Sequence, residues 1–398
     1  MATFDPAAAT AAYMATLSPA GHARATAYTQ GGHWLLLWSW VVAVAAAWLI
    51  VRSGVLVRVE TGMERKKPHL VLVSFVVSAL FVVIDFVLEL PWEAYAHWWR
   101  EQAYGLTSQP FTGWFGEQLI GLAINVVVTA LFLAALYALL RRAPKTWWIW
   151  AGGLMTVFLV LLLILGPVFI EPLFNTYTPA PPGPVRDTVI ALAEKADVPH
   201  DKIFIYNGSK QSNRYTANVA GLFGSARVAM SDVMFQKGAD LAEVRGVVGH
   251  EMGHYARGHV IWGALWVAIE ALLAFGLMQL LFPWAATLLR ADASSIADPA
   301  GLPVLAIIFA TFQLLVTPFD NTVTRLQEAD ADHFSLVVAN EPDGLSKALV
   351  KTIEYRADSP SAIEEFLFYD HPSVRRRVQT AMDWKAAHMT ATGEGTTP

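Results

Sequence analysis

The sequence predicts a predominantly α-helical, multi-pass membrane protein with a small β-sheet in its polar part. Apolar residues make up 55% of the 398 residues and charged residues only 15%, which is too apolar for an ordinary soluble protein of this size. Six apolar runs have about the 20 residues needed to cross a bilayer. Two short runs of strand-forming residues, Lys202–Tyr206 and Arg227–Ser231, lie between the fourth and fifth apolar runs.

The six apolar runs set the order of the chain. An N-terminal segment at residues 1–33 precedes a four-span membrane region at 34–171, and two further spans lie within 260–320. The first and last runs are near the lower length limit, so a buried core helix is the alternative for these two. In order, the runs are Trp34–Val51, Leu70–Leu90, Leu119–Leu140, Trp147–Ile170, Val260–Ala286 and Leu302–Phe319.

Two polar segments remain, at residues 172–259 and 321–385. An even number of spans separates them, so they lie on one side of the membrane and can build one site. The first segment opens with a Pro-rich linker at 177–184, which precedes an amphipathic helix at 185–197. The Thr- and Gly-rich residues 386–398 after the second segment are expected to be disordered.

The composition excludes several kinds of chemistry. Cysteine is absent, which excludes disulfides, thiolate metal ligands and thiol catalysis together. The net charge of −5 is mild, and no basic run predicts nucleic-acid binding. Residues 1–33 lack a basic stretch ahead of a short apolar core, so we expect no cleaved signal peptide. Any metal must therefore be held by His, Glu or Asp.

The motif His250-Glu-Met-Gly-His254 carries the strongest chemical signal. Residues four apart share one face of a helix, so His250 and His254 can direct imidazole nitrogens at one tetrahedral Zn²⁺. Glu251 then lies beside them as a general base. Asp240 opens a capping-box pattern, and apolar residues follow it at helical spacing, so the motif is predicted to lie on a helix.

A catalytic zinc needs a third protein ligand, which we seek in the second polar segment. Glu328 and Asp332 are four apart in a segment predicted to be helical. Glu328 can ligate zinc, while Asp332 accepts the remaining N–H of a ligand histidine. Without the upstream motif, a solvated acidic helix surface would be the simpler interpretation. Farther along, His371 and Arg377 are candidates for stabilising an oxyanion, although a plain surface charge is the commoner role of an arginine.

The residues between the two predicted strands offer a place for a substrate. If Thr216–Gly221 forms an open sheet edge, it can bind an extended peptide by strand addition, as proteases hold a backbone for cleavage. An ordinary loop is equally compatible with this stretch.

In these motifs the sequence resembles the integral-membrane, zinc-dependent CAAX prenyl endoproteases of type I and their bacterial relatives. The resemblance covers roughly residues 85–380, and the order of its motifs is far more specific than a lone His-Glu-x-x-His. Weaker similarity at Leu90–Trp92 and Tyr104–Gly105 extends it into the membrane half. The matching stretches are Glu171–Pro179, Asn207–Lys210 running to Gly221, His250–His254 with His259, Asn321–Arg325 leading into Glu328 and Asp332, and His371–Pro372 followed by Arg377.

The resemblance implies that the membrane helices enclose a water-filled chamber, closed on one side by a zincin-like catalytic domain. It implies one Zn²⁺ per chain and a hydrophobic or lipid-linked peptide as substrate. The site residues it implies are His250, His254 and Glu328 on zinc, His371 and Arg377 near the substrate, and Thr216, Ala217, Asn218 and Asn321 in substrate binding. The chain departs from the family where Thr216-Ala217 replaces the usual Asn-Ala, and it lacks the family's first span.

Polar residues inside the apolar runs fit a chamber. Asp85, Glu89, Asn125 and Glu270 lie within or near the spans, where ionisable groups normally face a cavity or a partner and not lipid. Pairing between helices is the alternative explanation.

The side of the membrane that carries the site is predicted differently by two arguments. Basic residues gather in the loops opposite the polar segments, so the positive-inside rule places those segments outside the cell. The family resemblance implies the cytoplasm. We expect the cytoplasmic side of the cell membrane, because long domains escape the charge rule. The basic loop residues are Arg58, Arg65, Lys66, Lys67, Arg141, Arg142 and Lys145, against Arg100 and Arg290 in the alternate loops.

The sequence therefore predicts a membrane-embedded zinc metalloendopeptidase. A quality-control protease that degrades membrane proteins would share the motif, and mapping of its products, scattered rather than near a C-terminus, would distinguish it. An inactive membrane scaffold or transporter that keeps a metal site is the alternative from another class. Glu251 argues against it, since a structural metal site has no need of that carboxylate.

Overall fold

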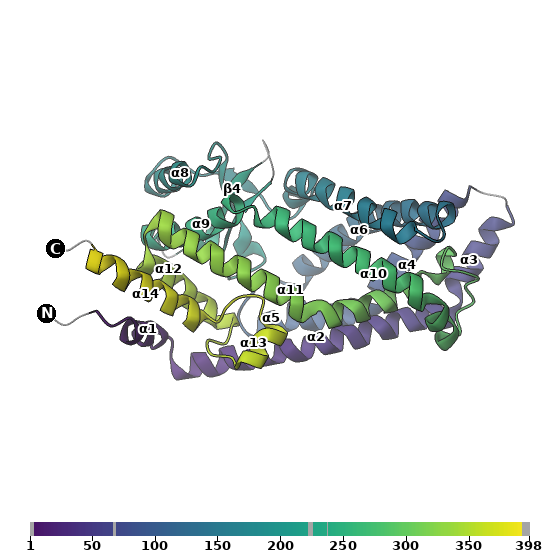
Figure 1. The fold of residues 1–398 in the computed structure, drawn as a ribbon, viewed down its shortest axis with the longest axis horizontal. Coiled ribbons are helices and arrows are strands. Elements are labelled where there is room, and N and C mark those ends of the chain that lie inside the picture. The colour runs from purple at the N-terminus through teal and green to yellow at the C-terminus, as the bar shows by residue number, and fades with distance from the viewer. Residues whose placement is uncertain (1–3, 67–68, 222–225, 237, 392–398) are drawn as a thin grey trace.

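The computed structural model describes residues 4–66, 69–221, 226–236 and 238–391 (Figure 1). The described chain is mostly helical, and six of its helices are long and apolar enough to cross a membrane. The predicted multi-pass helical fold is therefore confirmed. These helices are α2 (Pro19–Ser53), α4 (Leu70–Glu93, continued by a π-helical turn and by α5, Arg100–Ala103), α6 (Phe111–Arg142), α7 (Trp147–Leu165), α10 (His259–Leu289) and α11 (Leu302–Ala339).

The outward faces of these helices are apolar and exposed. Trp34 on α2, Leu280 on α10 and Leu315 on α11 expose 65%, 72% and 69% of their surface. Side chains of this size rarely gather on the surface of a soluble protein, and in a bilayer they face lipid. The same helices bury small and branched residues against one another, with Val77, Ala130 and Val304 fully buried.

The long helices α10 and α11 connect the membrane region to the polar part. In Figure 1 they run side by side along the molecule, α10 leading away from the end that carries the sheet and α11 returning to it. Both chain termini lie at that end, together with α1 (Pro6–Met14), α12 (Pro342–Lys351) and α14 (Val374–Ala391). The opposite end carries α3 (Val55–Glu64). The two polar segments therefore meet at one end of the helices, as predicted.

A mixed four-stranded sheet lies in the first polar segment. Its order is β1 (Tyr177–Pro179), β2 (Ile203–Tyr206), β4 (Arg227–Ser231) and β3 (Ala217–Ala220), and only the β2–β4 pair is parallel. Helices α8 (Pro184–Ala196) and α9 (Leu241–Ala256) share one core with it. Strand β3 is the outer strand next to α9, so the stretch expected to form a sheet edge does so. The buried side chains of this core include Val189, Leu192, Val228, Met230, Val244, Val248 and Met252.

Helix α9 begins as predicted but with half of the capping box. The side chain of Asp240 accepts hydrogen bonds from the backbone N–H groups of Ala242 and Glu243. The Glu243 carboxylate instead forms an ion pair with Lys351 at the end of α12. The cap therefore fixes where the helix starts, while the ion pair attaches it to α12.

Glycines allow α9 to touch its neighbours backbone to backbone. A Cβ at Gly246 would lie 2.6 Å from the backbone nitrogen of Leu345 on α12. A Cβ at Gly253 would lie 3.0 Å from the Cα of Ala331 on α11. The helix cost of about 1 kcal/mol for each glycine is offset by packing at these distances.

Some sequence expectations were wrong in detail. The stretch 177–184, expected to be a linker, begins with strand β1, which pairs with β2. Residues 386–391, expected to be disordered, continue helix α14 because its Trp384 and Met382 pack against the α1 and α12 region. Residues 392–398 lie outside the described residues. Much of the N-terminal segment is helical, since α2 begins at Pro19, capped by Ser18.

Replacement of Gly246 by Ala is expected to destabilise the protein by about 1–3 kcal/mol, because the new methyl group must displace the α12 backbone. Thermal unfolding of the purified protein in detergent measures the loss. Gly263→Ala on α10 is the matched control, since no described heavy atom lies within 4 Å of its Cβ position. An unchanged unfolding midpoint for Gly246→Ala would show that the two helices do not touch as described.

Candidate metal centre

The side chains of His250, His254 and Glu328 meet between α9 and α11. Their ligand atoms all lie within 4.8 Å of one another. The Nε2 atoms of the two histidines are 3.2 Å apart, and each lies close to the carboxylate, at 3.2 Å for His250 and 3.3 Å for His254. His250 and Glu328 are buried, and His254 is partly exposed. Two imidazole nitrogens and one carboxylate are a donor set found in catalytic zinc sites.

The carboxylate of Glu328 shows that the residues fit a metal ion. Its Oε2 atom is buried and accepts no hydrogen bond of good geometry from the described residues. Leaving a buried charged acceptor unsatisfied is costly, and a cation between the three side chains would satisfy it. A cavity of about 160 Å³ borders the cluster and leaves room for a substrate group.

His250 is oriented by a buried ion pair. Its Nδ1 lies 2.9 Å from Asp332 Oδ1, and Arg377 donates from Nε and Nη2 to the two Asp332 oxygens at 2.6 and 2.7 Å. These contacts turn the Nε2 atom of His250 toward the cluster. Burial alone would lower the pKa of His250, but its hydrogen bonds to Asp332 and Glu328 raise that pKa to about 10. Metal binding must therefore displace a proton.

His254 has an equivalent arrangement that the sequence analysis missed. Its Nδ1 lies 3.0 Å from Nδ1 of His259, and Nε2 of His259 lies 3.2 Å from Asp330 Oδ2. His259 belongs to the next helix, after the left-handed turn at Gly258. The signal that would have found it is a counting rule, because each ligand histidine needs a partner for its second ring nitrogen. The segment supplies two carboxylates for two histidines.

Glu251 lies between the metal cluster and the cavity. It lines the cavity together with His250 and Glu328. Burial raises the pKa of Glu251, while the neighbouring histidines act in the opposite direction. A carboxylate with a raised pKa can accept a proton near neutral pH and release it again, which suits a general base.

His371 and Arg377 both reach the cluster, but in different ways. His371 Nε2 lies 3.2 Å from Glu328 Oε2, and its Nδ1 is held by Asp370 at 2.8 Å. Arg377 is only 6% exposed and is already paired with Asp332, whose charge holds the pKa of the guanidinium above its ordinary value. The geometry thus favours Arg377 as a positioning residue for Asp332 and His250, and His371 as the group nearer to a substrate.

The predicted substrate-binding residues are divided between two cavities. Thr216 and Ala217, at the start of β3, line the cavity beside the metal cluster. Asn218 follows them on β3, and its side-chain oxygen is buried with no hydrogen bond from any described residue. Asn321 donates to the carbonyl of Leu367 at 3.0 Å and lines the neighbouring cavity.

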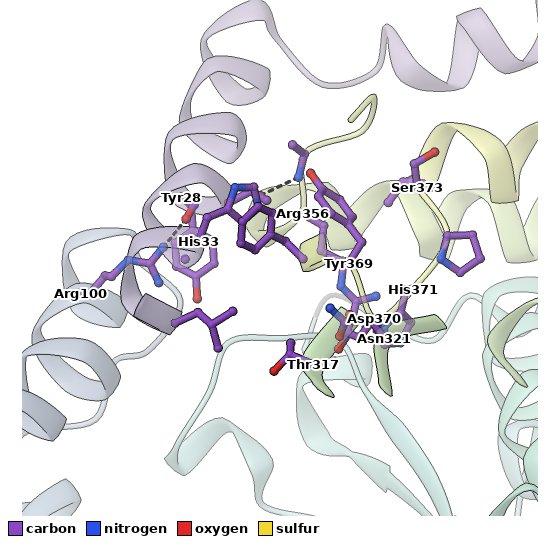
Figure 2. Close-up of a pocket in the computed structure, with 17 residues that line it drawn as sticks. Tyr28, His33, Arg100, Thr317, Asn321, Arg356, Tyr369, Asp370, His371 and Ser373 are labelled. Carbon is purple, nitrogen blue, oxygen red and sulfur yellow. Dashed lines mark hydrogen bonds and ion pairs between the residues drawn. The ribbon is translucent and has the colours of Figure 1, made fainter. Parts of the chain in front are cut away.

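That neighbouring cavity has a volume of about 330 Å³ and is shown in Figure 2. Tyr28, His33 and Arg100 lie on one side of it, and Tyr369 and His371 lie on the other. Two residues, Arg356 and His371, line both this cavity and the one beside the metal cluster. The two cavities are therefore neighbours, with Arg356 and His371 at their junction.

Residues 179–385, just over half of the chain, match the model of peptidase family M48. The chain belongs to peptidase family M48. Residues 6–176 match a second model, described as the N-terminal part of CAAX prenyl proteases with five membrane helices. Within those residues, the described part of this M48 peptidase has four candidate spans. The two matches meet where the membrane half gives way to the sheet.

Relatives at 24–28% identity cover most of the chain. A metalloprotease of Bacillus subtilis, named YhfN, is 28% identical over 84% of this chain and 79% of its own length. A CAAX prenyl protease 1 homolog of Arabidopsis thaliana is 26% identical over 83% and 78%, and CAAX prenyl protease 1 of Saccharomyces cerevisiae is 24% identical over 77% and 70%.

The fold also matches a solved structure. The crystal structure of S. mikatae Ste24p superposes with a TM-score of 0.66 at 23% identity, over 78% of this chain and 75% of that one. This likeness shows a shared fold. Together with the family matches and the His-His-Glu cluster, it makes the chain a multi-pass membrane metalloprotease, and none of these matches favours a scaffold or transporter.

Replacement of Asp332 by Asn is expected to weaken metal binding about 10- to 100-fold, because His250 loses the carboxylate that orients its ring. Competition with a chromogenic chelator measures the affinity. Asp383→Asn, at an exposed position of α14, is the control and should bind as the parent does. Equal affinity in a folded Asp332→Asn protein would contradict the positioning role.

Proposed function

We propose that this M48 peptidase is a zinc endopeptidase that cleaves hydrophobic or lipid-linked peptides at the membrane. One Zn²⁺ per chain is held by His250, His254 and Glu328. The observation that carries the proposal is the position of this cluster, which borders a cavity together with Glu251 and the start of an edge strand. Zinc is the metal that suits two imidazoles and one carboxylate with room for a further ligand.

The chain's own residues account for the proton transfers of peptide hydrolysis. When bound, zinc polarises the scissile carbonyl and makes water acidic enough to react near neutral pH. Glu251 removes the proton from the attacking water and passes it to the amine that leaves. His371, held by Asp370, lies on the cluster where it can stabilise the negative charge that develops on the carbonyl oxygen. Asp332 and Arg377 keep His250 in place throughout.

Strand β3 supports peptide binding by strand addition. It is the outer strand of the sheet, and its first residue, Ala217, lies at the cavity beside the metal cluster. An extended peptide paired with Thr216–Asn218 would have its backbone fixed beside Glu251. Val247, Leu345 and Leu349 also line this cavity, which suits an apolar side chain next to the cleaved bond. The relatives named CAAX prenyl proteases support a lipidated peptide.

We propose further that the membrane helices enclose a chamber through which such a substrate reaches the site. Asp85 and Glu89 on α4 are half-buried within a span, and Glu270 on α10 is 8% exposed. Ionisable groups at this depth are best satisfied by a water-filled space.

The replacement Glu251→Gln is expected to retain zinc while lowering the peptidase rate by at least about 100-fold, because only the general base is removed. Metal content per chain and the rate on a farnesylated peptide are both measured. A chelator should abolish the activity of the parent, and added Zn²⁺ should restore it. The mechanism is wrong if the metal-loaded variant cleaves as fast as the parent.

The active site is proposed to face the cytoplasm, with the sheet and both termini on that side. Reporter fusions after residue 398 and within the loop 143–146 are expected to report cytoplasmic and external positions respectively. The opposite pair of results would place the site outside and support the charge rule instead.

A further inference from the structure

The cavity of Figure 2 plays no part in the chemistry proposed above, although it adjoins the metal centre. Its walls come from four parts of the chain: α2, the start of α5, α11, and the segment 356–374. Its volume of about 330 Å³ lies within the range of pockets that hold small ligands, roughly 300–1,000 Å³. Leu36, Phe368 and Val374 give it apolar walls.

The charged groups of this cavity favour an anion. Its single acidic residue, Asp370, is paired with His371 at 2.8 Å. Its two arginines are Arg100, whose guanidinium stacks on the ring of Tyr28 at 3.8 Å, and Arg356. Arg356 Nη2 lies 3.4 Å from His371 Nε2, at the junction with the metal cavity. A positive charge thus stands between the cleavage site and a small pocket.

The direction of strand β3 shows which end of a bound peptide would enter the pocket. Antiparallel pairing is the more stable arrangement, and a peptide paired in this way passes Ala220 first and Ala217 last. Its C-terminal part therefore continues beyond the start of β3. Arg214, just before β3, donates to the hydroxyl of Tyr28, a residue of the second cavity. Tyr215 lies against the ammonium group of Lys351, at the start of the segment that leads to Arg356.

We propose that the second cavity is the subsite for the C-terminal end of the substrate, and that Arg356 binds its terminal carboxylate. An arginine fork matches a carboxylate in shape and charge, and the apolar walls accept the side chains before it. The substrate class is thus a peptide cleaved close to a free C-terminus. This inference rests on the proposed peptidase function and adds a specificity-determining residue to it.

The test compares two farnesylated peptides of the same sequence, one ending in a free acid and one in an amide. The full-length protein should cleave the acid with a kcat/KM about 10- to 100-fold higher, the range that one charge-assisted hydrogen bond gives. Arg356→Gln should lower kcat/KM for the acid alone, so that the ratio falls to about one. Arg356→Lys keeps the charge and should keep part of the preference. Arg376→Gln, exposed and outside both cavities, should keep the parent ratio.

Each outcome decides one claim. An equal rate of the parent on acid and amide, or a preference that survives in Arg356→Gln, overturns the carboxylate subsite and leaves the peptidase mechanism standing. Rates that instead follow the anionic lipid content of the vesicles would assign the pocket to a lipid headgroup and also overturn it. If Arg356→Gln does not fold, the parent ratio and the lysine variant still decide. Activity that persists in Glu251→Gln would contradict the peptidase proposal itself.

Discussion

His250 and Glu328 belong to segments separated by two membrane spans, and they meet only because α9 and α11 lie in direct contact. Gly249 and Gly253 make that contact possible, since Cβ atoms there would lie 2.9 Å from Ser335 Oγ and 3.0 Å from the Cα of Ala331. Close contact brings two imidazoles and a carboxylate to one point. It also buries Asp332, which would be costly without the charge of Arg377. Helix contact, ion pair and ligand cluster therefore depend on one another.

The membrane helices and the catalytic end are one construction. Helix α10 starts directly after the metal helix, at His259, and α11 carries Glu328 back from the membrane. A ligand histidine and its partner thus lie at the boundary between the polar part and a span. This arrangement places the site where an apolar peptide anchored in the bilayer can reach it without leaving the membrane surface. Edge strand β3 and the cavity that leads to Arg356 lie at the same end.

Local patterns in the sequence predicted much of this structure. The apolar runs predicted the six candidate spans, Asp240 predicted the start of the metal helix, and the four-residue spacing of Glu328 and Asp332 predicted a shared face. Contacts between distant side chains were not predictable in this way. The pairing of Arg377 with Asp332, the relay from His254 to Asp330, and strand β1 each depend on how elements far apart in the chain pack together. The junction at Arg356 carries no pattern at all, because a single arginine after a helix is usually a surface charge.

The central claim is that two histidines and one glutamate, from two helices, form the metal site. X-ray absorption at the zinc edge tests it directly on the purified, metal-loaded protein. The account predicts one zinc per chain, with two imidazole nitrogens at about 2.0–2.1 Å and the remaining ligands oxygen. A shell with three or four imidazoles would show that His259 or His371 ligates the metal in place of Glu328, and would contradict the account.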